Sequence, residues 1–174
     1  MAEGVRRCRY VGPAEVLAAV RADTVGQVIR TREGLAAWLG ERGRAELGEP
    51  FTFVVDLEGD LRLAPRRSEH VACAGGEPVL SAGEILFAEG PTGWAVEEAS
   101  NQSTGYCPEG GSWPAVGAAL DRAGVPHPGR FTVEIVFRRC PRCGERNVVR
   151  DDHFFCAICE GELPERWNFD AGSP

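Results

Sequence analysis

Lysine is absent from the sequence: all 19 basic residues among the 174 are arginine. A Walker phosphate-binding loop, a pyridoxal-phosphate or other Schiff-base enzyme and a lysine general base all need the ε-amine of lysine, so these chemistries are excluded. The simplest reason for the bias is a GC-rich coding sequence, which also favours alanine and glycine. Whatever its origin, the arginines are permanently charged and cannot serve as acids or bases.

Long apolar runs are also missing. No stretch approaches the roughly 18–20 apolar residues that a membrane-spanning helix needs. The N-terminal sequence, Met-Ala-Glu-Gly-Val-Arg-Arg-Cys, has no apolar region of the kind found in signal peptides. We therefore expect a soluble, cytoplasmic protein without a membrane partner. Its seven cysteines are expected to be thiols in a reducing compartment.

Positive charge is scarce in the middle of the chain. The net charge is −7, of which residues 1–50 carry +1, residues 51–130 carry −6 and residues 131–174 carry −2. Binding to a phosphate backbone depends on clustered cations that release counterions. Nucleic-acid binding by this acidic core is therefore not expected.

Apolar periodicity predicts helices near the N-terminus and strands in the middle of the chain. Helices are expected over 14–22 and from 23 or 24 to 39, and a break at Thr31 and Gly34 is the alternative for the second. The later elements are expected in the order strand, strand, strand, strand, helix, strand, at 51–56, 61–64, 79–88, 94–99, 112–123 and 131–137. This order is typical of an α+β fold with a mostly antiparallel sheet packed by helices.

Four cysteines near the C-terminus have the spacing of a metal site. Cys140-Pro-Arg-Cys143 and Cys156-Ala-Ile-Cys159 form two C-x2-C turns separated by twelve residues. Two thiolates on one tight turn can face one ion at about 2.3 Å, and four thiolates close the coordination shell of a structural zinc. The pattern predicts a zinc ribbon with one zinc per chain. A pair of disulfides and redox C-x2-C chemistry are the alternatives, and a reducing compartment and a doubled motif disfavour them.

The segment between the two turns is expected to form a short hairpin of 147–150 and 153–155, with Asp151 and Asp152 at its tip. The tail after the ribbon is expected to return over the core and bury Trp167 and Phe169. We divide the chain into an N-terminal helical segment (1–50), an α+β core domain (51–137) and the zinc ribbon with its tail (138–174).

Arginines gather around the four cysteines. With nearby aromatic side chains they suggest nucleic-acid binding, since bases stack on aromatic rings and phosphates pair with guanidinium groups. The alternative, which we favour, is that they offset the negative charge of a Zn(Cys)4 centre and of neighbouring acids. The arginines concerned are Arg138, Arg139, Arg142, Arg146 and Arg150.

Two polar loops rich in glycine, 66–84 and 101–108, flank a predicted hairpin and are expected to form the floor and rim of a binding site. Arginines at the start of the first loop can hold an anion or a carboxylate. The candidate ligand-binding residues are Arg66, Arg67, Gly75, Gly76, Asn101 and Ser103.

Residues of these two loops carry a resemblance to a known family. The matching positions are His70, Gly76, Pro78, Val79, Ala82, Gly83, Glu84, Asn101, Ser103, Tyr106 and Pro108. Over about residues 51–125 the chain resembles the central domain of plant IQ-motif calmodulin-binding proteins and similar modules of bacterial toxin-like or effector proteins. Val71, Ala72 and Gly105 depart from the family pattern, and the chain has no IQ motif. The resemblance therefore implies a shared domain, but neither calmodulin binding nor a settled reaction.

Two kinds of catalysis are compatible with the central loops. A thiol enzyme would pair Cys73 or Cys107 with His70 or His127, oriented by Asn101. The alternative for both cysteines is that they are buried, small hydrophobic side chains.

The second kind uses His70, Tyr106 and Glu134, whose chain order is similar to the His–Tyr–Glu set of one class of ADP-ribosyltransferases. That resemblance implies that the histidine and tyrosine hold the nicotinamide ribose of NAD and that the glutamate stabilises an oxocarbenium-like centre. The alternatives are a loop-fixing histidine, a packed tyrosine with a bonded hydroxyl and a solvent-facing strand glutamate.

The leading interpretation is a cytoplasmic, zinc-stabilised binding or regulatory module that recognises a small-molecule ligand or a protein partner between the two loops. An enzyme using NAD or another nucleotide through His70, Tyr106 and Glu134 is one alternative. Nucleic-acid binding through the arginine-rich ribbon is another.

Overall fold

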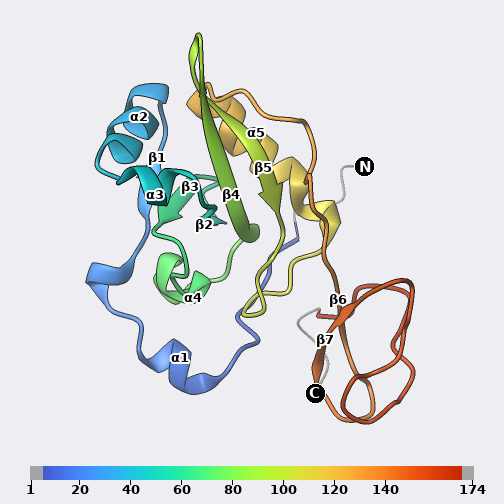
Figure 1. Cartoon of the computed structure of the whole chain (residues 1–174). Helices are drawn as coiled ribbons and strands as arrows, with labels where there is room; N and C mark the ends of the chain where they lie inside the picture. The colour runs from blue at the N-terminus through green and yellow to red at the C-terminus, as the bar shows by residue number, and fades with distance from the viewer. Residues whose placement is uncertain (1–5, 170–174) are drawn as a thin grey trace.

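The computed structural model describes residues 6–169 and shows a five-stranded antiparallel sheet in the order β1-β3-β2-β4-β5 (Figure 1). Each strand pairs antiparallel with its neighbours. The strands are β1 (Gln27–Ile29), β2 (Phe51–Val55), β3 (Leu61–Ala64), β4 (Ser81–Gly90) and β5 (Gly93–Ser100). A separate hairpin of β6 (Val136–Arg139) and β7 (Arg146–Val149) lies beside this sheet. The expected α+β fold with a mostly antiparallel sheet is confirmed.

Helices cover both faces of the central strands. On one face, α2 and α5 pack against alternate residues of β2, such as Phe53 and Val55. On the other face, α4 packs against Val54 together with the N-terminal arm and the C-terminal tail. The helices are α1 (Ala14–Ala18), α2 (Arg32–Gly40), α3 (Arg44–Leu47), α4 (His70–Cys73) and α5 (Trp113–Ala123), with single 3-10 turns η1 (Ala22–Thr24) and η2 (Gly110–Ser112).

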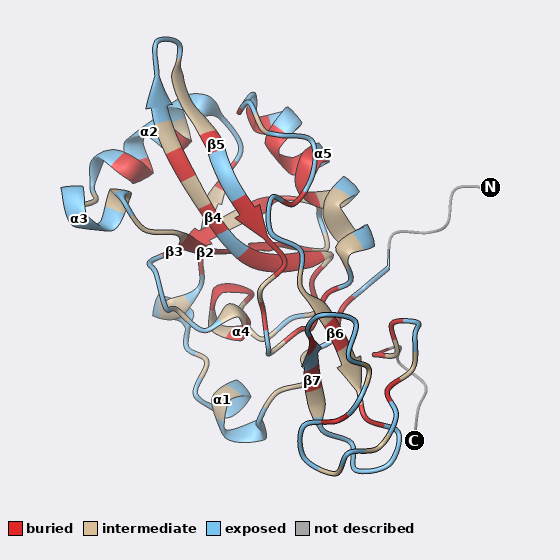
Figure 2. Cartoon of the chain, turned by 45° about the vertical axis from the view of Figure 1, so that its right-hand side comes forward, coloured by how far each residue is buried: buried red, intermediate tan, exposed pale blue. Residues whose placement is uncertain are grey.

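Burial follows this layering. Buried residues run through the centre of the sheet, whereas the tip of the β4–β5 hairpin projects beyond the helices and is exposed (Figure 2). No helix in residues 6–169 combines the length and the apolar character needed to cross a bilayer.

The helix expected from 23 or 24 to 39 is wrong in its first half. Residues 27–29 form the edge strand β1, which pairs with β3, and the helix begins only after Thr31. The hydroxyl oxygen of Thr31 accepts a hydrogen bond of 2.9 Å from the amide of Gly34 and so caps α2. Val28 and Ile29 fit either a helical or an extended pattern, and pairing with β3 decides between them. The first expected helix, 14–22, is shortened to Ala14–Ala18.

The last predicted strand is also shifted. Residues 131–135 run alongside the end of β5, where the amides of Thr132 and Val133 donate to the carbonyl of Ala99. The regular strand begins at Val136 and pairs with β7. The division into three domains stays a prediction, although β1 shows that residues 1–50 contribute to the central sheet as well as helices.

Candidate functional site

The four cysteine sulfurs of the predicted ribbon converge on one point. The Sγ atoms of Cys140, Cys143, Cys156 and Cys159 all lie within 4.8 Å of one another. The Cys140–Cys159 pair is 3.5 Å apart and the Cys143–Cys156 pair 3.6 Å. A disulfide would need about 2.05 Å, whereas four sulfurs at about 2.3 Å from a tetrahedral ion lie roughly 3.8 Å apart. The donor set and its spacing therefore fit a metal ion, and four thiolates favour zinc.

The two cysteine turns repeat the same hydrogen-bond pattern. In the first, the amide of Cys140 donates to Glu145 at 2.8 Å and the amide of Gly144 donates back to Cys140 at 2.9 Å. In the second, Cys156 donates to the carbonyl of residue 161 at 2.8 Å, and the amide of residue 160 donates back at 2.9 Å. The residue after each second cysteine has a positive φ, which folds the turn around the two sulfurs.

Hydrogen-bond donors favour the thiolate form of Cys140 and Cys156. For Cys143, the backbone N–H of Glu145 lowers the pKa, but burial and the neighbouring thiols raise it to about 12. The backbone N–H of Cys159 is the largest cause that lowers the pKa of Cys156, to about 6, and the amides of Ile158 and Asn147 add to it. The backbone N–H of Cys143 is the largest cause that lowers the pKa of Cys140. Because a metal binds the thiolate form, these donors suit a metal centre. Asn147 is buried beside Cys156, and its Nδ2 lies 3.5 Å from the sulfur as one of these donors.

The hairpin expected between the two turns is wrong in its partners. Strand β7 pairs with β6 across the first cysteine turn, and not with residues 153–155. Phe155 instead makes a single bridge with Glu162 across the second turn. The turn at Asp151 and Asp152 is present, and both residues adopt a positive φ. Each C-x2-C turn also reverses the chain direction, as the turn of a β-hairpin does. The residues on either side of one cysteine turn therefore pair with each other and not with residues of the other turn.

Most of the ribbon arginines are directed at the protein's own backbone. Arg138 donates to Pro164 at 3.0 Å, Arg139 to Gly144 at 3.4 Å and Arg142 to Cys159 at 3.4 Å. Arg146 reaches across to the carbonyl of Thr104 in the core. These contacts support the structural alternative for the cluster, and nucleic-acid binding by the ribbon stays a prediction.

The C-terminal tail returns over the core as expected. Trp167 and Phe169 are buried, with 6% and 7% of their surface exposed. They pack in the cluster that includes Tyr106 and Phe137, between the sheet and the ribbon.

His70, Tyr106 and Glu134 occupy separate surroundings. The Nε2 of His70 donates to the carbonyl of Gly83 at 2.8 Å, and burial lowers the pKa of its imidazole. The hydroxyl of Tyr106 donates to the carbonyl of Glu77 at 2.6 Å, and the side chain is fully buried.

Glu134 is exposed and its carboxylate lies against Gly110. None of the three lines the cavity beside Trp38 and Arg42. None lines the smaller cavities beside Pro50, Arg32 and Phe155. The internal bonds favour structural roles, and catalysis by this set stays a prediction.

The cysteine candidates for catalysis are buried thiols. Burial raises the pKa of both Cys73 and Cys107 to about 12, which makes them weak nucleophiles. Cys73 donates to the carbonyl of Arg62, whereas Cys107 donates to that of Thr104. His127 bonds to Asp121 at 3.0 Å. These contacts join neither cysteine to a histidine.

Asn101 and Ser103 have their polar atoms engaged inside the fold. The amide of Asn101 donates to Pro108 and Ile135 at 2.9 and 2.8 Å, and its oxygen accepts from Ile135 at 2.7 Å. The hydroxyl oxygen of Ser103 accepts from the amide of Tyr106 at 3.3 Å. The loop 101–108 is therefore a brace between β5 and the segment that leads into the ribbon.

The other candidate ligand-binding residues lie around α4. Arg66 pairs with Glu49 at 2.5 Å, and Arg67 is exposed in a turn with a positive φ. Gly75 and Gly76 follow α4, also with positive φ. A methyl group at either glycine would contact Val25 or Leu17 of the N-terminal segment. Ligand binding by these residues stays a prediction.

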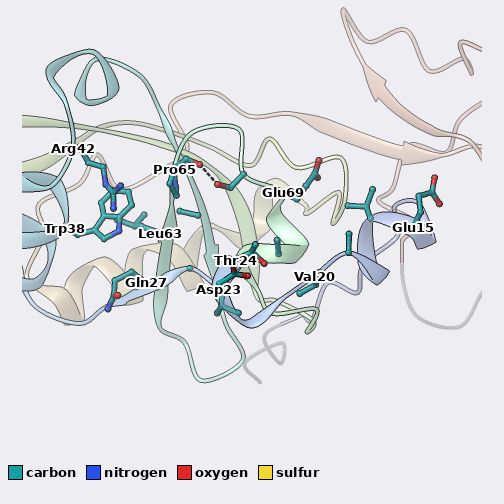
Figure 3. A pocket seen from close by; sticks show the side chains of 17 residues that line it. Glu15, Val20, Asp23, Thr24, Gln27, Trp38, Arg42, Leu63, Pro65 and Glu69 are labelled. Carbon is teal, nitrogen blue, oxygen red and sulfur yellow. Dashed lines mark hydrogen bonds between the residues drawn. The ribbon is translucent and has the colours of Figure 1, made fainter.

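A trough that sequence reasoning missed lies next to these residues. It has a volume of about 760 Å³ and runs between α1, η1 and β1 on one side and α2, the end of β3 and α4 on the other. Figure 3 shows Trp38 and Arg42 at one end and Glu15 and Glu69 toward the other. No motif marks it, because its walls come from three separate parts of the chain, at 15–27, 38–42 and 63–72. It is larger than the cavity of about 590 Å³ on the ribbon.

Arg42 is the unusual residue of the trough. Its guanidinium lies 4.2 Å from the centre of the Trp38 ring, and its nearest carboxylate, of Glu41, is 3.8 Å away. The Nε atom is buried and has no hydrogen-bond partner within residues 6–169. A buried donor without an acceptor costs free energy, so it marks a place where an acceptor is missing.

In comparisons with known proteins, no family model, no curated sequence and no solved structure matches this chain. The resemblance to the central domain of IQ-motif proteins therefore stays a prediction.

Proposed function

We propose that this chain is a zinc-stabilised binding module and that the trough beside Trp38 and Arg42 receives its ligand. The observation that carries the proposal is a mostly apolar cavity of about 760 Å³ that ends at an arginine with an unpartnered donor. Small-molecule sites typically span about 300–1,000 Å³, with apolar walls and a few polar groups that orient the ligand.

Zinc has a structural role in this proposal. The four cysteines would hold the ion, and with four thiolate ligands no position is left for a bound water or substrate. The ion would tie the two cysteine turns together in a ribbon that has only a small apolar cluster, built around Val149 and Leu163. The chemistry of ligand recognition then belongs to the core.

The two ends of the trough suggest what the ligand carries. The guanidinium of Arg42 suits a carboxylate, because it offers planar donors in a fork. Glu15 and Glu69, toward the other end, suit an ammonium group. Between them, side chains such as Val20, Leu63 and Ala72 provide apolar walls. We infer that the ligand is a short apolar peptide with free termini, whose carboxylate faces Arg42.

Titration calorimetry with trileucine tests this function. Two matched probes, N-acetyl-trileucine and trileucine amide, each lack one terminal charge. A charge-assisted hydrogen bond contributes about 1.5–3 kcal/mol, so either cap should weaken binding by roughly tenfold or more. Arg42→Gln should remove the difference between trileucine and its amide but keep the effect of the acetyl group.

The control is Arg44→Gln, because Arg44 is exposed on α3 and does not line the trough. It should leave all three affinities unchanged. Equal binding of the free and capped peptides would show that the terminal charges of the peptide do not contribute to binding. Failure of all three to bind at millimolar concentration would remove the trough as the ligand site.

A further inference from the structure

The zinc ribbon has an apolar outer face that its own fold leaves uncovered. Six large hydrophobic residues are exposed within residues 6–169, and three of these six lie between residues 148 and 158. These are Val148, Phe155 and Ile158, with 38%, 45% and 71% of their surface exposed. We call them the outer ribbon face. Val148 and Phe155 line one cavity, and Ile158 follows Ala157 of the same cavity wall. Exposed hydrophobic residues gathered in this way mark a contact surface, whereas single ones are ordinary.

The outer ribbon face is not a by-product of the ribbon core. Val149 and Phe154 point into that core, beside Cys140 and Cys156, and their neighbours Val148 and Phe155 point outward. Outward positions of such a pattern are usually polar. Ile158 occupies the place in the second cysteine turn that Arg142 occupies in the first. The first cysteine turn thus forms with a charged residue at this position, so the turn itself does not require an apolar side chain.

A hollow accompanies the outer ribbon face. Val148 and Phe155 line a cavity of about 590 Å³ together with Ala157 and the charged side chains of Arg150 and Glu160. The His153 ring lies 5.0 Å from that of Phe155 and extends this surface. The surface is therefore shaped to receive side chains rather than to meet a flat partner.

The charge around the outer ribbon face is negative. Residues 145–162 contain five carboxylates and two arginines, and the carboxylates are all exposed. Arg146 donates to Thr104 in the core. Arg142 donates to the carbonyl of Cys159, the residue after Ile158. Arg142 and Arg150 are therefore the arginines near the face, against five carboxylates. The carboxylates are Glu145, Asp151, Asp152, Glu160 and Glu162.

We propose that the outer ribbon face docks a cationic, apolar segment of a partner protein, with the partner's apolar side chains on Phe155 and Ile158 and its cations beside the carboxylates. Charge complementarity selects this occupant. Nucleic acid and an anionic lipid surface would be repelled. A second copy of this chain would bring the same carboxylates against themselves in a two-fold contact.

The test uses the full-length, zinc-loaded protein and a labelled peptide of repeated Leu-Arg, with its N-terminus acetylated and its C-terminus amidated. The capped termini prevent the terminal contacts proposed for the trough, and Arg42→Gln should leave binding unchanged. Fluorescence anisotropy should show saturable binding that weakens as salt rises. A peptide of repeated Leu-Glu and a single-stranded oligonucleotide should bind at least tenfold more weakly.

Two variants locate the binding. Ile158→Asp should weaken the Leu-Arg peptide at least tenfold, whereas Val133→Asp should not, because Val133 is equally apolar and 51% exposed but lies outside the ribbon. The double variant Asp151→Asn, Asp152→Asn should weaken binding of the Leu-Arg peptide several-fold. The double variant Glu89→Gln, Glu97→Gln removes the same charge outside the ribbon and should weaken it less. Asparagine tolerates the positive φ of both aspartates.

Zinc content measured on each variant shows that the ribbon is intact. Equal loss with Ile158→Asp and Val133→Asp would overturn the proposal, since binding would then not depend on the apolar side chain of the ribbon. Preference for the oligonucleotide or for the Leu-Glu peptide would overturn it as well.

Discussion

The indole N–H of Trp167 donates a hydrogen bond of 2.7 Å to the carbonyl oxygen of Cys107. Trp167 belongs to the tail that follows the second cysteine turn, and Cys107 belongs to the loop that follows β5. Arg146 of β7 donates to Thr104 in the same loop. The segment that carries the four cysteines is therefore fastened to the core through the loop 101–108. Asn101 closes this loop on Pro108 and bonds it to Ile135, which directly precedes β6.

Removal of the metal should loosen this junction. We expect metal analysis of the reduced protein to find about one zinc per chain, because four converging thiolates close one tetrahedral shell. A chelator should then unfold the ribbon, since structural zinc contributes on the order of 10 kcal/mol or more to small domains. Trp167 should become exposed, so tryptophan fluorescence should shift to longer wavelength.

The variant Trp167→Phe serves as the control for this signal and should remove most of the chelator-induced shift. Cys156→Ser should lose the metal, whereas Cys73→Ala should retain it, because Cys73 lies in α4 away from the cluster. Zinc-free protein after reduction, together with an unchanged spectrum on chelation, would contradict a metal-dependent ribbon.

Local signals in the sequence were sufficient where one segment determines its own structure. A run of aromatic and β-branched residues predicts β2, and the Gly59-Asp60 turn predicts its pairing with β3. Pro114 in the first turn and the following Gly124 predict α5. The spacing of the four cysteines predicts their convergence, because each C-x2-C turn is a local structure. These features agree with the observed fold.

Sequence patterns did not predict features that depend on contacts between distant segments. Strand β1 is three residues long, and its conformation depends on β3, more than thirty residues later. The trough needs walls from α1, β1, α2, β3 and α4, so no window of the sequence contains it. The central loops looked like a binding site because they are rich in polar groups and glycine. In the fold, Asn101 and Tyr106 use those polar groups to hold backbone carbonyls.

Acid should weaken the fold through His70. Burial lowers the pKa of its imidazole below 6.5, so the unfolded chain binds a proton more readily than the folded one. The neutral ring therefore stabilises the fold fully above pH 6.5, and this contribution is lost as the pH falls below that value. Urea unfolding at pH 7.5 and pH 5.5 should show a larger loss of stability for the native sequence than for His70→Gln.

Glutamine at this position keeps an N–H donor for the carbonyl of Gly83 but does not titrate. His153→Gln is the matched control, since His153 is exposed, and it should retain the loss seen in the native sequence. Measurements with zinc present in excess keep the metal centre constant. A pH dependence that is unchanged by His70→Gln would show that the imidazole does not titrate in this range.

A methyl group at Gly83 should disrupt the sheet. A Cβ at this position would lie 1.8 Å from the carbonyl oxygen of Ser100, a backbone atom of the neighbouring strand, so β4 and β5 would have to separate. We expect Gly83→Ala to lower the free energy of unfolding by about 3 kcal/mol or more.

Gly40→Ala is the matched substitution, because no atom lies within 4 Å of its Cβ and it occupies the last position of α2. It should be neutral or stabilise by up to about 1 kcal/mol, since alanine favours helix over glycine. Urea unfolding of both variants measures the difference, and similar midpoints for the two would contradict the close approach of β4 and β5 at Gly83.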